Sequence, residues 1–351
     1  MSISHKSRQN ILYEVVPIRL FLIISLVFYH AFAIFSGAWK PINCYPEVKF
    51  YAVLDKLSYA CLLETFVFIS GYILGYQVRL KGRDSVLNFK KLLISKFKRL
   101  LVPSILFSII YLYCFGDMTK PILLLFYDIL NGVGHMWFLP MLFWCFIFIP
   151  FVERINMTYR WTILLILALI YFSVLPLPFR FGVALYYFLF FYVGYLFQKN
   201  QLITKYSCTK MKLFVSLIAF LGIFTLKYLF DDSYIYNNLN GRILLKIVFY
   251  IMQTTLKAIC ASLGVFLLLH ISLIFLNKRE RSIWNNLLLL SECSFGVYLF
   301  QQFILQYFNR SNLPYMINPY VYPWVSFVLC IVISVFVTFL FRKTKIGKQL
   351  I

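Results

Sequence analysis

The sequence predicts an all-α integral membrane protein: a bundle of about ten transmembrane helices with both termini in the cytoplasm. Three observations lead to this fold class. Hydrophobic residues make up 62% of the 351 residues and charged residues only 13%, whereas a typical soluble domain is about half apolar and about a quarter charged. The apolar residues fall into runs of about twenty, the length that crosses a bilayer. Most basic residues lie between these runs.

The expected spans follow one another along the chain. They lie near 14–36, 55–78, 99–116, 135–153, 161–177, 181–198, 213–230, 243–276, 285–307 and 320–341. The eighth run is long enough for one tilted helix, or for an interfacial piece near 242–253 followed by a span. The stretch 117–134 is ambiguous and could be a partly buried loop. We expect one transmembrane domain over 1–351. No cleavable signal peptide is expected, because the first run is too long and lacks a cleavage pattern.

The basic residues predict the orientation. If ten spans alternate, most of the 34 lysines and arginines fall on one side, and the positive-inside rule makes that side cytoplasmic. These membrane anchors also explain the net charge of +22, so we reject nucleic-acid binding. The expected location is the inner (plasma) membrane, which the chain crosses several times.

The cysteines predict neither a metal site nor a disulfide framework. None of the eight forms a CxxC pair, and most lie inside apolar runs. We interpret them as small buried hydrophobic residues.

Ionisable side chains inside membrane spans are costly and usually mark a function. Arg19 and His30 begin and end the stretch RLFLIISLVFYH. At about 100° per residue, their separation of eleven places them on nearly the same helix face, with His30 about 16 Å farther along. This face suits an elongated anionic ligand. The structural alternatives are snorkelling of Arg19 to the lipid headgroups and a core histidine bonded to a backbone or tyrosine partner.

Other polar groups are weaker candidates. Glu64 must be neutral or paired in the second span. Its partner could be His30 or a basic residue. The alternative is a protonated carboxyl that makes a structural hydrogen bond. The run KKLLISKFKRLLVP is either a cytoplasmic anchor or a phosphate site. His135 is expected at a span edge, and His270 is expected to be structural.

Several stretches, in order over nearly the whole chain, together resemble the membrane acyltransferase-3 family. RLFLIISLVFYH is similar to its first-span signature of an arginine, ten residues and a histidine. ETFVFISGYILGYQ resembles its second-span block, and KFKRLLVP resembles its basic pair before a proline. HMWFLPMLF resembles its Trp-Phe-Leu block, and SFGVYLFQQ its late block, which usually reads Ser-x-Gly-x-Tyr-Leu-x-His.

The resemblance implies an O-acyltransferase, usually an acetyltransferase. Such a protein moves an acyl group from cytoplasmic acyl-CoA, a donor substrate rather than a permanently bound cofactor, to a hydroxyl of a glycan or lipid-linked sugar. By position, the resemblance implies that His30 is the catalytic histidine and Arg19 its first-span partner. It also implies that Lys96 and Arg99 meet the phosphates of coenzyme A.

The chain departs from the family pattern at two positions. Lys96 stands where arginine is usual, which keeps the charge but loses the bidentate fork. Gln301 stands where the late block usually has histidine, and an amide cannot titrate. We interpret Gln301 as a residue that supports structure or substrate fit.

These observations predict acyl transfer in a cavity among the first, second, third and ninth helices. Arg19 would help Lys96 and Arg99 to hold the phosphates, and Glu64 would orient the imidazole of His30. Oxyanion donors could be Ser70, Ser294 or Tyr298. Covalent and direct transfer both stay open. The expected acceptor is a sugar of a cell-envelope or capsular polysaccharide.

Two other functions remain open from the sequence. A transporter or flippase for a lipid-linked sugar or polysaccharide unit would also use buried charges and a broken helix, although no inverted repeat is visible. A structural scaffold in a polysaccharide-synthesis complex would need none of these polar residues.

Overall fold

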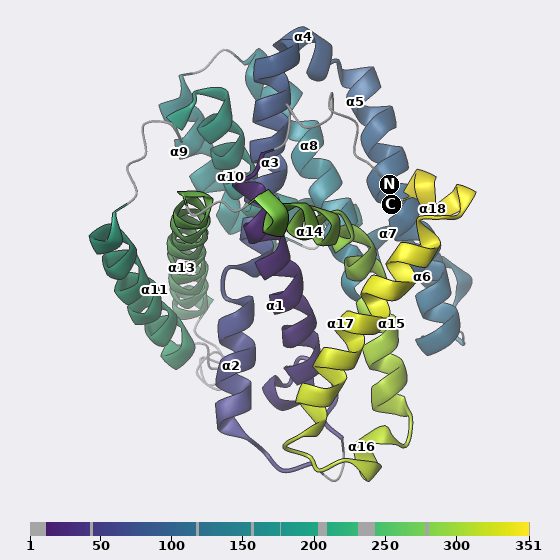
Figure 1. The fold of residues 1–351 in the computed structure, drawn as a ribbon. Helices are drawn as coiled ribbons and strands as arrows, with labels where there is room; N and C mark the ends of the chain where they lie inside the picture. Colours follow the sequence, from purple (N-terminus) through teal and green to yellow (C-terminus); the bar gives the residue numbers. More distant parts are fainter. Residues whose placement is uncertain are drawn as a thin grey trace.

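The computed structural model describes residues 12–350 except 43–44, 117–118, 156–157, 176, 203–208, 231–242 and 278–280. Within these ranges all regular secondary structure is helical, and the helices form one bundle (Figure 1). Eight helices are long and apolar enough to cross a membrane, and a bent pair makes a ninth candidate. The predicted class, an all-α multi-pass membrane protein, is confirmed. The side on which the termini lie and the single-domain boundary stay predictions.

The helices follow the chain with short connections between many of them. Their bounds are α1 Val15–Ser36, α2 Lys49–Tyr59, α3 Leu62–Lys81, α4 Arg83–Val86, α5 Phe89–Lys96, η2 Phe97–Leu101, α6 Val102–Phe115, α7 Ile122–Asn131, η3 Gly134–Trp137, α8 Phe138–Arg154, α9 Tyr159–Leu169, η4 Ile170–Val174, η5 Pro178–Arg180, α10 Phe181–Lys199, α11 Lys210–Phe230, α13 Ile243–Asn277, α14 Arg281–Glu292, α15 Ser294–Arg310, α16 Leu313–Met316, α17 Tyr322–Phe341 and α18 Lys345–Leu350.

The spans expected at 55–78 and 99–116 begin earlier in the structure, at Lys49 and Phe89, and two others of the ten expected spans are not straight single spans. The run 161–177 corresponds to the helical stretch Tyr159–Val174, which is apolar but shorter than a full span. The run 285–307 is split between α14 and α15, whose axes bend by 58° around Cys293. The apolar pattern alone does not reveal a bend of this kind, because both helices keep their hydrophobic residues.

Two ambiguous stretches also take a definite form. The long run 243–276 is the single helix α13, Ile243–Asn277, rather than an interfacial piece followed by a span. The stretch 117–134 contains an apolar helix, α7, instead of forming only a loop.

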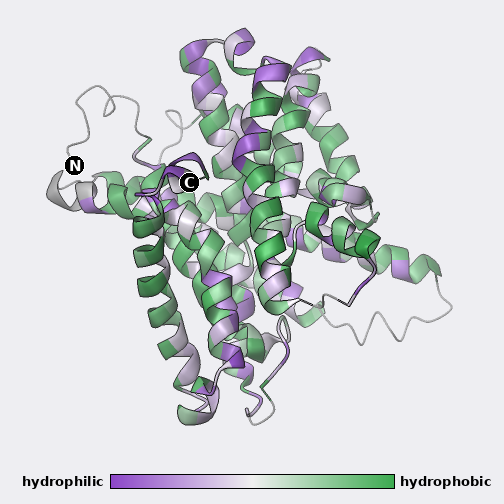
Figure 2. Ribbon diagram, turned by 90° about the vertical axis from the view of Figure 1, so that its right-hand side faces the viewer, coloured by the Kyte–Doolittle hydropathy of each residue, from purple (hydrophilic) through white to green (hydrophobic). Residues whose placement is uncertain are grey.

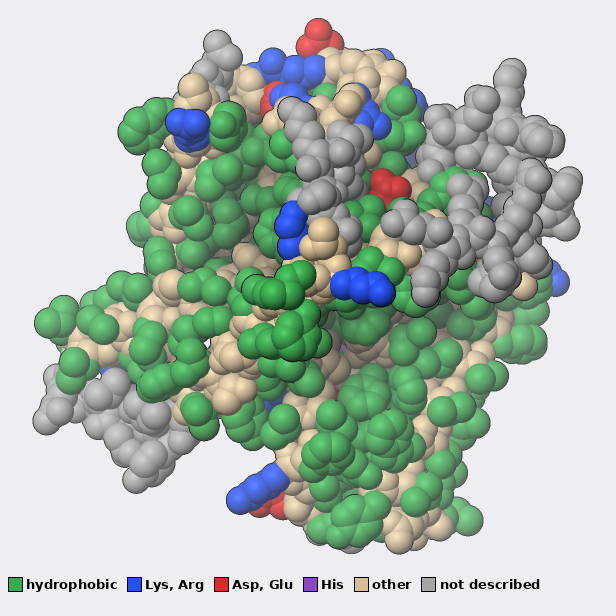
Figure 3. Space-filling view, turned by 60° about the vertical axis from the view of Figure 1, so that its left-hand side comes forward, with side chains coloured by type: hydrophobic (Ala, Val, Ile, Leu, Met, Phe, Trp, Pro, Cys, Tyr) green, Lys and Arg blue, Asp and Glu red, His purple; other side chains and the backbone are tan. Residues whose placement is uncertain are grey.

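The inner and outer helices of the bundle are all apolar, but they differ in how much of their surface is buried. In α8 and α10 72% of the most apolar window is buried, whereas α11 has only 11% buried. Hydrophobic colours cover most of the length of the long helices in Figure 2. The surface in Figure 3 is likewise mostly hydrophobic, with a group of Lys and Arg side chains at its upper end. An apolar outer surface is what lipid requires.

The contact between α3 and α10 depends on small residues. A Cβ on Gly71 would collide with the backbone oxygen of Phe191, and one on Gly194 would collide with that of Phe68. Without side chains at these points the two backbones approach closely, as small residues allow between membrane helices. This contact fixes the rotation of α3 and therefore the direction of its polar side chains.

Helix α1 lies against α2, α14, α15 and α17. It ends at Gly37, whose φ of 81° gives the left-handed cap that glycine adopts without strain. The packing brings the first part of the chain beside the last, which positions the candidate site.

The described cysteines are free, and all of them except Cys114 are buried. Cys44 and Cys208 lie outside the described residues.

Candidate active site

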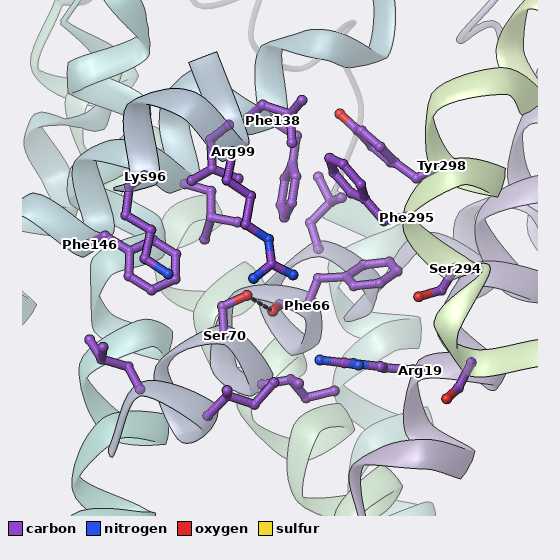
Figure 4. Close-up of a pocket in the computed structure, with 18 of the residues that line it drawn as sticks. Arg19, Phe66, Ser70, Lys96, Arg99, Phe138, Phe146, Ser294, Phe295 and Tyr298 are labelled. Atoms are coloured by element: carbon purple, nitrogen blue, oxygen red, sulfur yellow. Dashed lines mark hydrogen bonds between the residues drawn. The ribbon is translucent and has the colours of Figure 1, made fainter. Parts of the chain in front are cut away.

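A partly open cavity of about 360 Å³ lies among α1, α3, η2, α8 and α15 (Figure 4). Its walls include these predicted site residues: Arg19, Ser70, Lys96, Arg99, Ser294 and Tyr298. The cavity therefore joins the first-span arginine, the second-span Ser-Gly block, the basic pair and the late block. His30 and Glu64 do not line it.

Basic side chains dominate the polar part of the cavity wall. The guanidinium groups of Arg19 and Arg99 face the same space in Figure 4, beside Ser70. The Nζ of Lys96 lies 3.8 Å from the centre of the Phe146 ring, a cation–π contact that holds the ammonium group at the wall. Like charges gathered in one cavity repel one another, so this arrangement favours an anionic ligand.

A fourth cation reaches the cavity from the end of α17. Arg342 lies 3.2 Å from Oε2 of Glu292, and both residues line the cavity. Glu292 is the single carboxylate among the lining residues that the structure describes. The cavity thus holds four basic side chains and one acidic side chain, and this excess suits a ligand with more than one phosphate.

The local structure around Arg99 follows from Pro103. Proline has no N–H to give to the carbonyl oxygen of Arg99, four residues earlier, so the α-helical ladder cannot continue regularly. The chain forms the π-helix η2 instead, in which the N–H of Val102 donates to the oxygen of Phe97. A π-helical turn changes the angle between Lys96 and Arg99 relative to an α-helix, and such turns are frequent at functional sites.

His30 is buried beyond the cavity, with 7% of its surface exposed. Its Nδ1 lies 3.0 Å from Oε1 of Gln301, and its ring stacks on Trp39 with centroids 5.4 Å apart. Leu26, one turn before His30 on α1, still lines the cavity. Arg19 therefore faces the cavity itself, and His30 lies past the cavity along the same helix.

Tyr298 and His135 connect the cavity wall to the surroundings of His30. The Tyr298 hydroxyl donates to the backbone oxygen of His135 at 2.6 Å. The His135 ring lies 6.4 Å from that of His30, and the His135 N–H donates to Oε1 of Gln302 at 2.8 Å. The prediction that His135 lies at the edge of a span fits its place in η3, but the residue is buried inside the bundle.

Two of the three proposed oxyanion donors already give their hydrogens to backbone carbonyls. Ser70 donates to Phe66 at 2.9 Å (Figure 4), and Tyr298 donates to His135. Both hydroxyls would have to break these bonds before donating to a ligand. Ser294 lines the cavity and stays a candidate.

Glu64 lies beside a basic residue, one of the two kinds of partner that the sequence allows, and not beside His30. Its Oε1 accepts a hydrogen bond from the Tyr186 hydroxyl at 3.2 Å and lies 3.8 Å from Nζ of Lys257. The physical reason is the rotation of α3: Leu63, Phe66 and Ser70 face the cavity, whereas Glu64 faces α10 and α13. These contacts link α3 to α10 and α13 through Glu64, and its support for His30 stays a prediction.

His270 behaves as the sequence predicts. It is buried in α13, and its Nδ1 lies 3.1 Å from the backbone oxygen of Phe266, one turn earlier. The carbonyl is an acceptor, so Nδ1 donates within the helix.

Sequence reasoning missed several residues of this region. The sequence pattern does not mark Gln302, Trp39, Arg342 or Lys257, and it gives Gln301 only a general supporting role. The consecutive glutamines of SFGVYLFQQ were the available signal. Neighbours on a helix point about 100° apart, so they can reach two different histidines.

A profile of the acyltransferase 3 family, described as an acyltransferase domain, matches residues 18–343. The chain belongs to the acyltransferase 3 family. The match covers all the blocks that form the cavity and the His30 region. No curated protein and no solved structure matches the chain. Membership in the acyltransferase 3 family implies O-acyltransferase activity and hence an acyl donor, an acceptor and a bilayer around the helices.

Proposed function

We propose that the protein transfers an acyl group, with acetyl the expected one, from acyl-CoA to a sugar hydroxyl of a cell-envelope or capsular polysaccharide. The observation that carries this proposal is one cavity in which Arg19, Lys96, Arg99 and Arg342 face a common space next to the buried His30. Membership in an acyltransferase family favours this function over the transporter alternative.

The basic cavity fits the donor end of this reaction. Coenzyme A carries its phosphates at one end and its thioester at the other, joined by the extended pantetheine arm. Arg19 and His30 are separated by about 16 Å along α1, a distance comparable to that arm. Phosphates held among the arginines would place the thioester near His30, with the cavity mouth open to the cytoplasm.

The imidazole of His30 would act as general base. Its Nε2 takes the proton of the acceptor hydroxyl while the oxygen attacks the thioester carbonyl. The carbon–sulfur bond then breaks, and the proton passes from the imidazole to the leaving thiolate. The products are an O-acyl sugar and coenzyme A, and the histidine returns to its starting state.

The depth of His30 separates the two substrates. The donor approaches from the side of the basic cavity, and the acceptor approaches from the opposite side. They would meet inside the bundle, so the acyl group would cross part of the membrane without leaving the protein.

The test uses membranes that contain wild-type protein, His30→Ala or His270→Ala, supplied with radiolabelled acetyl-CoA and a glycan extract. His270 is the matched control, because it is also a buried histidine of a long helix but is bonded within its own helix. We expect label transfer to fall by at least about 100-fold in His30→Ala, the size of effect that a general base contributes. Transfer by His270→Ala should stay near wild type. Equal transfer by His30→Ala and wild type would refute the catalytic role.

A further inference from the structure

Gln301 and His30 make a polar contact that links α15 to α1. The Gln301 side chain is completely buried, and its Oε1 lies 3.0 Å from Nδ1 of His30. The two residues are 271 positions apart in the chain, so only the packing of the last helices against the first brings them together.

This contact decides which nitrogen of His30 carries the proton. An amide oxygen can only accept a hydrogen bond, so Nδ1 must donate. In a neutral imidazole the other nitrogen, Nε2, then holds the lone pair. A general base needs that lone pair, and the opposite tautomer would present an N–H to the acceptor hydroxyl instead.

The surroundings hold both partners in place. Trp39 lies almost parallel to the His30 ring, at an interplanar angle of 12°. The backbone oxygen of Gln301 lies 3.4 Å from Sγ of Cys330 on α17. The ring therefore has a fixed plane, and the glutamine has a fixed backbone.

The neighbouring glutamine cannot replace Gln301. The Oε1 of Gln302 accepts from the backbone N–H of His135, and so it is directed to a different histidine. Gln301 also has a spare donor: its Nε2 has no hydrogen-bond partner in the part of the chain that the structure describes. In the described part of the chain, the side-chain amide of Gln301 therefore has His30 as its single hydrogen-bond partner.

We propose that Gln301 is the positioning residue of the acyl transfer, which holds His30 in the tautomer with Nε2 free to accept the hydroxyl proton. The proposal rests on the proposed function, in which His30 is the base. Gln301 fills the role that a carboxylate fills in a catalytic triad, but it does so without charge. A carboxylate in this position would favour the protonated imidazolium form, whereas the uncharged amide does not. The imidazole can therefore stay neutral, as a general base requires.

The test compares Gln301→Met, which keeps the size but loses the acceptor, with Gln301→Glu, which keeps an acceptor oxygen. We expect Gln301→Met to lower kcat on the order of 100- to 10,000-fold, the range that loss of the correct tautomer causes in a triad. The KM for acetyl-CoA should change less than about twofold, because Gln301 does not line the phosphate cavity. Gln301→Glu should keep kcat within about tenfold of wild type at its optimum.

The pH profile of Gln301→Glu is the readout that a merely structural role would not move. A carboxylate beside Nδ1 favours the protonated imidazole, so the acidic limb of the kcat profile should move to higher pH. Gln198→Met is the control for loss of a buried glutamine, because Gln198 lies in α10. Its kcat should stay near wild type.

Three results would overturn the inference. They are turnover by Gln301→Met within threefold of wild type, a loss in Gln301→Glu as large as in Gln301→Met, or an unchanged acidic limb in Gln301→Glu. Adding Gln301→Met to His30→Ala should cause no further loss, because positioning acts only through the histidine. If His30→Ala is itself fully active, the proposed role of His30 as the base fails and the role of Gln301 fails with it; if His30→Ala is inactive and Gln301→Met is active, only the role of Gln301 fails.

Discussion

The hydroxyl of Tyr298, a residue that lines the basic cavity, donates to the backbone oxygen of His135 at 2.6 Å. Both residues are buried. The bond joins α15 to the short η3 turn, so Tyr298 supports the position of His135 rather than offering a free hydrogen to a ligand.

Tyr298→Phe should therefore lower stability more than catalysis. Loss of the hydroxyl removes one of two donors to the His135 carbonyl, which also accepts from the Phe138 N–H, and one such bond contributes about 0.5–1.5 kcal/mol. We expect a lower melting temperature and a turnover rate within about tenfold of wild type. If turnover instead slowed by about two to three orders of magnitude, the range for loss of an oxyanion donor, Tyr298 would act on the reacting atoms.

Arg99→Ala should weaken donor binding more than acceptor binding. A charge-assisted hydrogen bond contributes about 1.5–3 kcal/mol, so the Kd for acetyl-CoA should rise roughly 10- to 100-fold. Isothermal titration of protein in nanodiscs measures this constant. Lys98→Ala is the control, because Lys98 is exposed in the same π-helix but does not line the cavity. An unchanged Kd in Arg99→Ala would contradict the phosphate site.

Glu292→Gln should strengthen donor binding. The substitution removes the one described carboxylate of the cavity wall and frees Arg342 from its ion pair. Both partners are partly exposed, so the gain should be small, on the order of two- to fivefold in Kd, and should shrink in high salt. Weaker binding in Glu292→Gln at low salt would show that the ion pair itself shapes the donor site.

Lys257→Met should destabilise the fold through Glu64. The substitution leaves a buried carboxylate with Tyr186 as its described hydrogen-bond partner. We expect a loss of about 1–3 kcal/mol, since removing one member of a buried pair leaves the other charge uncompensated. Thermal unfolding of single and double variants measures this.

The double variant Lys257→Met with Glu64→Gln separates a structural from a catalytic role of Glu64. Neutralising both partners should recover most of the lost stability and leave kcat within about tenfold of wild type. A kcat that falls in Glu64→Gln as far as in His30→Ala would show that Glu64 takes part in catalysis.

The sequence predicted the fold class because lipid imposes a simple pattern on every span. Runs of apolar residues of sufficient length are visible without any knowledge of neighbours, and α1, α8 and α10 lie within a few residues of their predicted bounds. The apolar pattern did not predict the length of every helix or the bend within a span. The run 161–177 is too short for a span in the structure, and the run 285–307 bends around Cys293.

In the candidate site, too, the sequence predicts some relationships between residues and not others. The shared face of Arg19 and His30 follows from helical periodicity, and the basic pair Lys96 and Arg99 follows from the order of the family blocks. These relationships are local or lie within one block, so the sequence by itself determined them.

The tertiary structure alone decided which distant groups meet. Gln301 reaches His30 across 271 residues, Tyr186 reaches Glu64 across 122, and Arg342 enters the cavity from the end of α17. Such contacts depend on the rotation of each helix about its axis and on the close approach of helices such as α3 and α10 at glycines. Helical periodicity fixes which residues share a face, but only packing decides what that face meets.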